Sequence, residues 1–130
     1  MKASREDLIQ YRLHRAKDTF EDAQILADRE KWNSSINRLY YSAYYAVMAL
    51  LLFSELNPAT HNGAKSNFTE YFIKTERIPK NFGKMYSQLF TWRQKGDYDD
   101  LFDFDQEKVM PYFEPVQKLI DLIESIVKER

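Results

Sequence analysis

The sequence contains no cysteine, and its 130 residues include only two histidines, three glycines and four prolines. A chain without cysteine has no thiol nucleophile, zinc–thiolate site or disulfide framework. The glycines form no phosphate-binding loop, and neither a metal-binding histidine motif nor a serine nucleophile elbow is present. We therefore expect no metal and no organic cofactor.

The sequence also lacks an excess of charge and a long apolar run. Nineteen Lys and Arg residues against twenty Asp and Glu residues give a formal net charge of -1, which argues against a DNA-coating protein but permits a local basic patch. The longest apolar run, Ala43 to Phe53, is too short to cross a bilayer. Because the first residues, MKASREDLIQYR, are charged, we expect a cytoplasmic protein that does not bind a membrane.

Helical periodicity runs through most of the chain. Apolar residues recur at alternating steps of three and four, which predicts long helices from about Arg5 to Glu30, from about Asn33 to Glu55 and from about Asp105 to near the C-terminus. Ser4 and Asp7 resemble a capping box that starts the first of them.

Two shorter stripes lie between these long segments. They predict a helix from Gly63 to about Glu76 and another from Pro79 to about Gln94. Lys95-Gly96-Asp97 should end the latter helix, and the acidic, aromatic stretch over residues 97–104 should form an ordered loop.

These helices indicate an all-α fold, because no alternating strand pattern competes with them. Steps of three and four are typical of left-handed bundles. We therefore expect a single domain over residues 1–130, an up-and-down four-helix bundle with an additional short helix. Pro111 and Pro115 should kink the last helix near its start.

The second long helix is apolar on more than one side. From Leu39 to Phe53 only Ser42 is plainly polar, so either the other helices enclose this helix or a second copy of the chain covers part of it. Tyrosine suits a half-exposed interface, because the ring packs while the hydroxyl stays in water. The four tyrosines of this helix, Tyr40, Tyr41, Tyr44 and Tyr45, thus favour a homodimer.

The two histidines differ in their surroundings. His61 stands in Thr60-His61-Asn62-Gly63, directly before a predicted helix, where free N–H groups and the helix dipole favour an anion such as phosphate. The alternative is structural: Thr60 or Asn62 caps the helix and His61 packs locally. His14 lies off the apolar stripe of its helix and is expected to face solvent.

Two arginines are candidates for holding a phosphate. Arg93 has Lys95 alongside, and Tyr98 could stack on a base or donate a hydrogen bond. The alternative for Arg93 is an ion pair with Asp97 or another of the carboxylates that follow it. Arg38 lies in an apolar, tyrosine-rich stretch, where its charge needs either a carboxylate or a phosphate as partner.

Three ordered motifs resemble the HEPN superfamily. They are Arg38-Leu39-Tyr40-Tyr41 with its neighbours, Thr60-His61-Asn62-Gly63, and Arg93-Gln94-Lys95-Gly96-Asp97-Tyr98. The resemblance extends from about Asp18 to Ile126 and is strongest to a small, stand-alone bacterial and archaeal branch. It implies a compact helical bundle, commonly a dimer, that acts on or binds RNA or nucleotides. Many such proteins resemble toxins or the partners of a minimal nucleotidyltransferase.

Ribonucleases of this superfamily carry an arginine, four to six intervening residues and a histidine at the dimer interface, and they cleave RNA without metal through the ribose 2′-hydroxyl. Arg93 matches the arginine, but the positions open to the histidine hold Tyr98, Asp99 and Asp100. Neither Tyr nor Asp has an ordinary pKa suited to proton transfer near neutral pH. This argues against ribonuclease activity unless the fold brings His61 beside Arg93.

Three hypotheses follow. The first is a non-catalytic HEPN domain that binds a nucleotide or RNA and works with a nucleotidyltransferase in a toxin–antitoxin-like module. Its binding residues would be Arg38, Tyr41, His61, Arg93, Lys95, Asp97 and Tyr98. The second is an endoribonuclease in which Arg93 stabilises the phosphate and His61 or Tyr98 carries the proton. The third is a scaffold that binds only protein, in which case Arg93 and His61 should lie far apart.

Overall fold

The computed structural model describes residues 4–98 and 103–128, and for residues 96–98 only the helical backbone. No strand occurs in these ranges, so the predicted all-α fold is confirmed. The six α-helices are α1 (Arg5–Asp28), α2 (Trp32–Phe53), α3 (His61–Phe68), α4 (Lys80–Tyr98), α5 (Gln106–Val109) and α6 (Phe113–Lys128). A π-helical turn, η1 (Thr69–Ile73), continues α3, and a 3-10 turn, η2 (Met110–Tyr112), joins α5 to α6.

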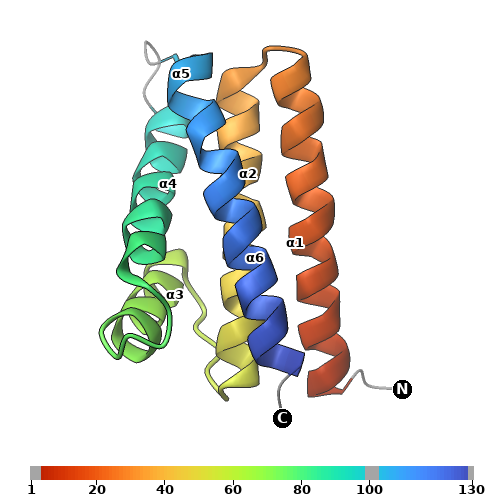
Figure 1. Cartoon of the computed structure of the whole chain (residues 1–130), viewed down its shortest axis with the longest axis vertical. Helices are drawn as coiled ribbons and strands as arrows, with labels where there is room; N and C mark the ends of the chain where they lie inside the picture. Colours follow the sequence, from red (N-terminus) through yellow and green to blue (C-terminus); the bar gives the residue numbers. More distant parts are fainter. Residues whose placement is uncertain (1–3, 99–102, 129–130) are drawn as a thin grey trace.

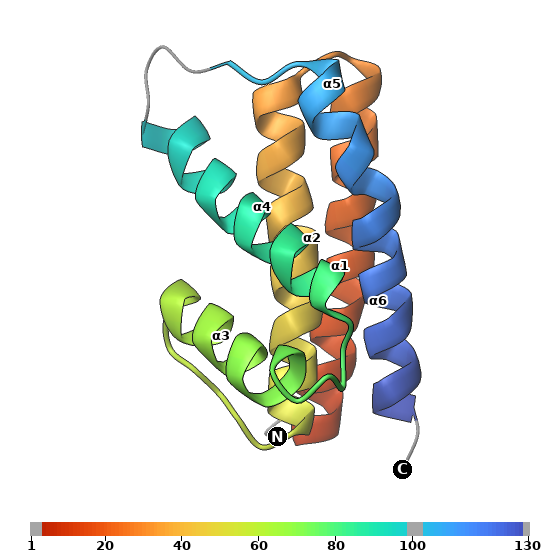
Figure 2. The same ribbon diagram turned by 60° about the vertical axis from the view of Figure 1, so that its left-hand side comes forward.

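The four long helices α1, α2, α4 and α6 alternate in direction, as expected for an up-and-down bundle (Figure 1). Along the chain, the shorter α3 lies between α2 and α4. Figure 1 shows α3 and α4 on one side of α2 and α1 on the other, and in Figure 2 α4 crosses in front of α2. Because α2 contacts α1, α3, α4 and α6, the other helices enclose most of its apolar surface.

Several helix ends follow the predicted capping chemistry. Ser4 and Asp7 form the reciprocal capping box at the start of α1. Asp105 accepts a hydrogen bond from the backbone N–H of Lys108 at 3.0 Å and so caps α5. The 3-10 turn that contains Pro111 interrupts the last helical segment, as its prolines predicted.

The third helix begins earlier than expected, at His61 rather than Gly63. The reason is that Thr60 provides the cap, its Oγ1 accepting the backbone N–H of Gly63 at 2.9 Å. A Cβ at position 63 would lie 3.0 Å from that oxygen and 3.1 Å from the Cβ of Pro58, so only glycine leaves the cap undisturbed. His61 is therefore fixed in the first turn of α3 and does not precede it.

The end predicted for the fourth helix near Gln94 is wrong, because α4 continues to Tyr98. A glycine inside a helix costs only about 1 kcal/mol relative to alanine, which is too little to stop the helix, and the α-helical backbone continues through Gly96. The loop predicted over residues 97–104 is correspondingly shorter at its start, and its residues 99–102 lie outside the described ranges.

The α1–α2 interface is built from small side chains. The hydroxyl of Ser35 donates to the carbonyl of Ala23 at 2.9 Å, and that of Ser42 donates to the carbonyl of Ala16 at 2.7 Å. All four residues are buried. Small residues at a contact let helix axes approach closely, and the hydroxyls find partners there.

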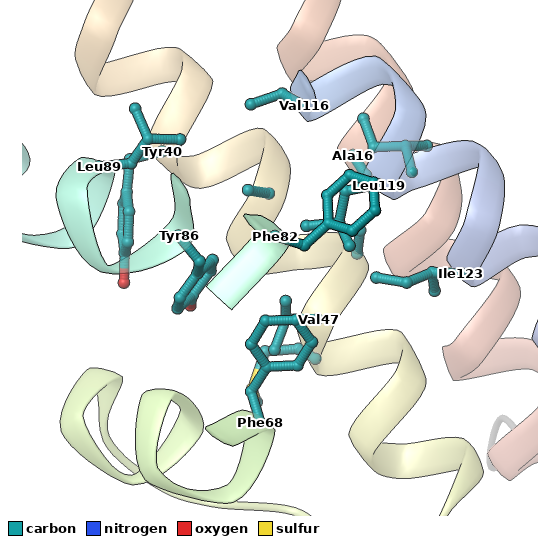
Figure 3. Close-up of a cluster of buried hydrophobic side chains, with 14 of the residues drawn as sticks. Ala16, Tyr40, Val47, Phe68, Phe82, Tyr86, Leu89, Val116, Leu119 and Ile123 are labelled. Carbon is teal, nitrogen blue, oxygen red and sulfur yellow. The ribbon is translucent and has the colours of Figure 1, made fainter. Parts of the chain in front are cut away.

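Larger apolar side chains fill the space between the remaining helices. Figure 3 shows buried side chains from α2, α3, α4 and α6 gathered in one cluster, among them Val47, Phe68, Phe82 and Leu119. Within the described part of the chain, no helix is both long enough and apolar enough to span a membrane. The core thus fixes α3 and α4 against α2, and this arrangement positions the residues discussed next.

Candidate functional site

The side of α2 that faces α3 and α4 carries a cluster of tyrosines. Tyr40 is fully buried, and its ring lies 5.8 Å from that of Tyr86 on α4, measured between centroids. Tyr41 and Tyr44 are half-buried and contact each other edge to face at 6.0 Å. Aromatic rings in this arrangement form a rigid wall against which polar groups from other helices can pack.

His61 is held against this wall by α3. Its Nδ1 lies 2.8 Å from the hydroxyl oxygen of Tyr40, within hydrogen-bond distance, and its ring lies 4.3 Å from that of Tyr44. Burial, and after it the positive charge of Arg93, lowers the pKa of His61 below its ordinary value. At neutral pH the imidazole is therefore uncharged, with one ring nitrogen engaged by Tyr40.

Arg93 reaches the same wall from α4. Its guanidinium carbon lies 5.2 Å from the ring centroid of Tyr40 and 5.9 Å from that of Tyr41, and Nη1 donates a hydrogen bond to the Tyr41 hydroxyl at 3.3 Å. The Nε–H of Arg93 is buried and has no hydrogen-bond partner among the described residues. A buried guanidinium donor without a partner is costly, and an anion would relieve that cost.

Arg38 completes the cluster from α2 itself. Its guanidinium carbon lies 4.9 Å from the ring centroid of Tyr41, and Nε and Nη2 both donate to the side-chain oxygen of Asn37. Within the described ranges, neither Arg38 nor Arg93 forms an ion pair with a carboxylate. We call these residues, Arg38, Tyr40, Tyr41, His61 and Arg93, the Arg93–His61 cluster.

The electrostatics of the cluster suit an anion. The guanidinium of Arg93 acts on the neutral imidazole of His61, that of Arg38 lies over the neighbouring Tyr41 ring, and the tyrosine hydroxyls supply neutral donors. Burial raises the pKa of Tyr40 to about 12, so its hydroxyl keeps its proton at neutral pH. Arginines that are partly withdrawn from water bind phosphate more strongly than exposed ones, because their charge is less screened.

The structure thus brings together four of the residues singled out in the sequence, namely Arg38, Tyr41, His61 and Arg93. Lys95 is exposed near the end of α4. The side chains of Asp97 and Tyr98 lie outside the described residues, and so does the alternative ion pair between Arg93 and Asp97.

Two further expectations concern the histidines, the exposure of His14 and the distance between His61 and Arg93. His14 is exposed, as expected, and its Nε2 lies 3.1 Å from a carboxylate oxygen of Asp18. The scaffold hypothesis required Arg93 and His61 to lie far apart, whereas both contact Tyr40. The structure therefore contradicts that requirement.

Two arginines of α1 extend the positive surface and were not singled out in the sequence. Arg12 donates to the carbonyl of Met48 at 3.1 Å, and Arg15 donates to the hydroxyl of Tyr45 at 3.3 Å, with its guanidinium carbon 5.1 Å from that ring. The available signal was their spacing of three residues, just outside the apolar stripe of α1. It was weak, because such positions usually face solvent.

Comparison with known proteins identifies a family and several relatives. The family model of the HEPN domain matches residues 9–127. A UPF0332 protein of Thermotoga maritima is 34% identical over 125 residues, which is 96% of this chain and 95% of the relative.

Two further relatives come from Methanocaldococcus jannaschii, and each is named "Putative toxin". One is 31% identical over 96 residues, covering 74% of this chain and 65% of the relative. The other is 28% identical over 121 residues, covering 93% and 90%.

Proposed function

Because the chain belongs to the HEPN family, we propose that it binds a phosphate group of a nucleotide or RNA at the Arg93–His61 cluster, as part of a toxin-like system. The observation that carries this proposal is the guanidinium of Arg93 beside His61 and Tyr41, whose buried Nε–H has no hydrogen-bond partner among the described residues. A phosphate oxygen carries negative charge, so a hydrogen bond that it accepts from a guanidinium is stronger than one accepted by a neutral group.

Each residue of the cluster has a distinct part in this proposal. Arg93 and Arg38 supply positive charge close to the Tyr41 ring, their guanidinium carbons lying 5.9 and 4.9 Å from its centroid. Tyr41 and Tyr44 offer rings on which a base can stack. His61, oriented by Tyr40, supplies a further hydrogen bond through the ring nitrogen that Tyr40 does not engage. Lys95, Asp97 and Tyr98 stay in the proposal as binding residues predicted from the sequence.

Titration with adenosine nucleotides and short RNAs tests the proposal. Saturable binding that Arg93→Ala weakens by roughly ten- to a hundredfold supports it, because a hydrogen bond to a charged group contributes about 1.5–3 kcal/mol. Arg29→Ala removes the same charge from the exposed end of α1 and serves as the matched control. If no ligand binds, or if both variants behave alike, the proposal fails.

A second candidate function is metal-independent cleavage of RNA, favoured by the position of His61 beside Arg93. A neutral imidazole can take the proton of a ribose 2′-hydroxyl, whose oxygen then attacks the adjacent phosphorus while the bond to the 5′-oxygen breaks. Arg93 would stabilise the charge on the phosphorus-bound oxygens. Cleavage in the presence of a chelator that His61→Ala abolishes would establish this function. RNA that stays intact at high protein concentration would exclude it.

The proposal also includes two partners expected from the sequence. A second copy of the chain would pack against the tyrosine-rich side of α2 around the half-buried Tyr45, with the Arg93–His61 cluster left open in the cleft beside it, and light scattering in solution tests this homodimer. A minimal nucleotidyltransferase is the second partner, and the toxin names of two relatives support a paired module. Co-expression with a nucleotidyltransferase encoded beside the gene tests it, with a stable complex as the expected result.

A further inference from the structure

Two hollows lie next to each other along the surface formed by α3, η1 and α4. The larger, of about 550 Å³, lies between η1 and the first three turns of α4, and the smaller, of about 310 Å³, lies over α3 and η1. Thr69 and Lys74 line both hollows, so the two hollows adjoin, and we treat them as one groove. We call it the lysine groove.

The charge of the groove is strongly one-sided. Four lysines line it, Lys65, Lys74, Lys80 and Lys84, and among the described lining residues Glu70 is the one carboxylate. Glu70 is already paired with Lys74 at 3.1 Å. This concentration of positive charge occurs in a chain whose formal net charge is -1, so it is local.

The floor of the groove depends on an irregular backbone segment. The π-helical turn η1 places Ile73 against Gly83 of α4, where an added Cβ would lie 3.0 Å from the Cγ2 of Ile73. Gly83 therefore lets η1 and α4 approach, and a larger side chain there would push them apart. Single π-helical turns occur frequently at functional sites.

The groove begins beside the Arg93–His61 cluster. Asn62, which follows His61 in the first turn of α3, lines the smaller hollow, and Lys65 lies one turn after His61 on the same helix face. The ammonium group of Lys65 lies 4.8 Å from the ring centroid of Phe90, which precedes Arg93 by one turn of α4. From this end the groove continues toward Lys80.

We propose that the lysine groove carries the backbone of a single-stranded RNA, one phosphate of which is held at the Arg93–His61 cluster. This inference rests on the proposed function and names its substrate as an RNA strand rather than a free nucleotide. Positively charged grooves that follow the backbone next to aromatic stacking positions are typical of single-strand binding. Hydroxyl and amide side chains between the lysines, among them Ser66, Ser87 and Gln88, suit phosphate and ribose oxygens.

A protein segment fits the groove less well. Protein interfaces are enriched in aromatic residues and depleted in lysine, whereas the groove is rich in lysine and none of the described residues that line it is aromatic. The lysines stand along a helix edge, Lys80 and Lys84 being about 20 and 14 Å from Arg93 along the α4 axis. A dinucleotide bound at the cluster would not reach them, and a strand of about ten nucleotides would.

The test compares two labelled RNAs, a dinucleotide and a decamer, with the full chain. In the Lys80→Ala/Lys84→Ala variant we expect decamer affinity to fall roughly twentyfold at 0.1 M salt and the slope of its logarithm against log salt to decrease by about 1.4. Dinucleotide affinity should not change. Lys118→Ala/Lys128→Ala removes the same charge from exposed positions of α6 and should leave both affinities unchanged.

The outcomes separate this inference from the proposed function. If the Lys80→Ala/Lys84→Ala variant binds the decamer as tightly as the unmodified chain does, the RNA-binding role of the groove is wrong, although the cluster still binds phosphate. An equal loss for dinucleotide and decamer also overturns it, because the lysines would then act on the cluster. If the unmodified chain binds neither RNA, the proposed function itself fails. Circular dichroism of each variant verifies that the helices are retained.

Discussion

The hydroxyl oxygen of Tyr40 and the Nδ1 of His61 lie 2.8 Å apart, although 21 positions separate the two residues in the chain. Tyr40 is fully buried between α2 and α4, and His61 opens α3. This contact fixes the orientation of the imidazole and leaves its other nitrogen for a ligand. The Arg93–His61 cluster therefore depends on how α3 docks against α2.

Tyr40→Phe tests this dependence directly. The buried ring stays in place while the hydroxyl is lost, so we expect the free energy of unfolding to fall by about 1 kcal/mol and nucleotide binding to weaken as His61 loses its fixed orientation. Urea unfolding and a binding titration measure the two effects. Tyr11→Phe, which removes an exposed hydroxyl from α1, is the control and should alter neither.

The pH dependence of stability reports the environment of His61. Because its pKa is lowered in the folded protein, the unfolded chain takes up a proton at a higher pH than the folded chain does. The stability that neutral His61 provides is complete above the unfolded value of about 6.5 and is lost as the pH falls from there toward the lowered pKa. His61→Asn should flatten this part of the unfolding profile. A profile unchanged by the substitution would show that His61 is not desolvated.

The cap of α3 is sensitive to the residue at position 63. In Gly63→Ala, the new Cβ meets Thr60 Oγ1 at 3.0 Å and disrupts the cap, a loss of up to about 2 kcal/mol. Replacing a helical glycine by alanine returns about 1 kcal/mol, so we expect a net loss of up to about 1 kcal/mol. Thr60→Ser keeps a capping hydroxyl and should be nearly neutral. Chemical unfolding of both variants distinguishes a lost cap from a general intolerance of this turn.

The α1–α2 interface has little free space beside Ser42. Ser42→Val adds volume and removes the hydrogen bond to the carbonyl of Ala16, and we expect a loss of about 1–3 kcal/mol. Ser125→Val, at an exposed position of α6, should change the free energy of unfolding by less than about 0.5 kcal/mol. Equal effects of the two substitutions would mean that the interface is less tightly packed than described.

The long helices could be predicted from the sequence because each carries an apolar stripe over several turns. The starts of α1 and α5 could also be predicted, since Ser4 and Asp105 cap these helices by local hydrogen bonds. The end of α4 could not, because a glycine inside a helix costs only about 1 kcal/mol and does not by itself fix where the helix ends. The π-helical turn after Phe68 leaves no comparable local signal.

The candidate site could be predicted only in part from the sequence, because its contacts depend on tertiary packing. Residue type pointed to Arg93 and His61 separately, but their approach results from the packing of α3 and α4 on α2. The hydrogen bond between Arg93 and the Tyr41 hydroxyl joins residues 52 positions apart, and no local sequence pattern predicts it. Arg12 and Arg15 were overlooked because their tyrosine partners become neighbours only when α1 and α2 pack.

The most direct measurement follows the two imidazole rings by NMR during titration with a dinucleotide. The account predicts a saturable shift of the His61 ring resonances and a rise in the pKa of His61, because a bound phosphate offsets the positive charge of Arg93. His14, exposed on α1, is the internal control and should not respond. A saturating ligand that leaves His61 unmoved, or that shifts both rings alike, would contradict the account.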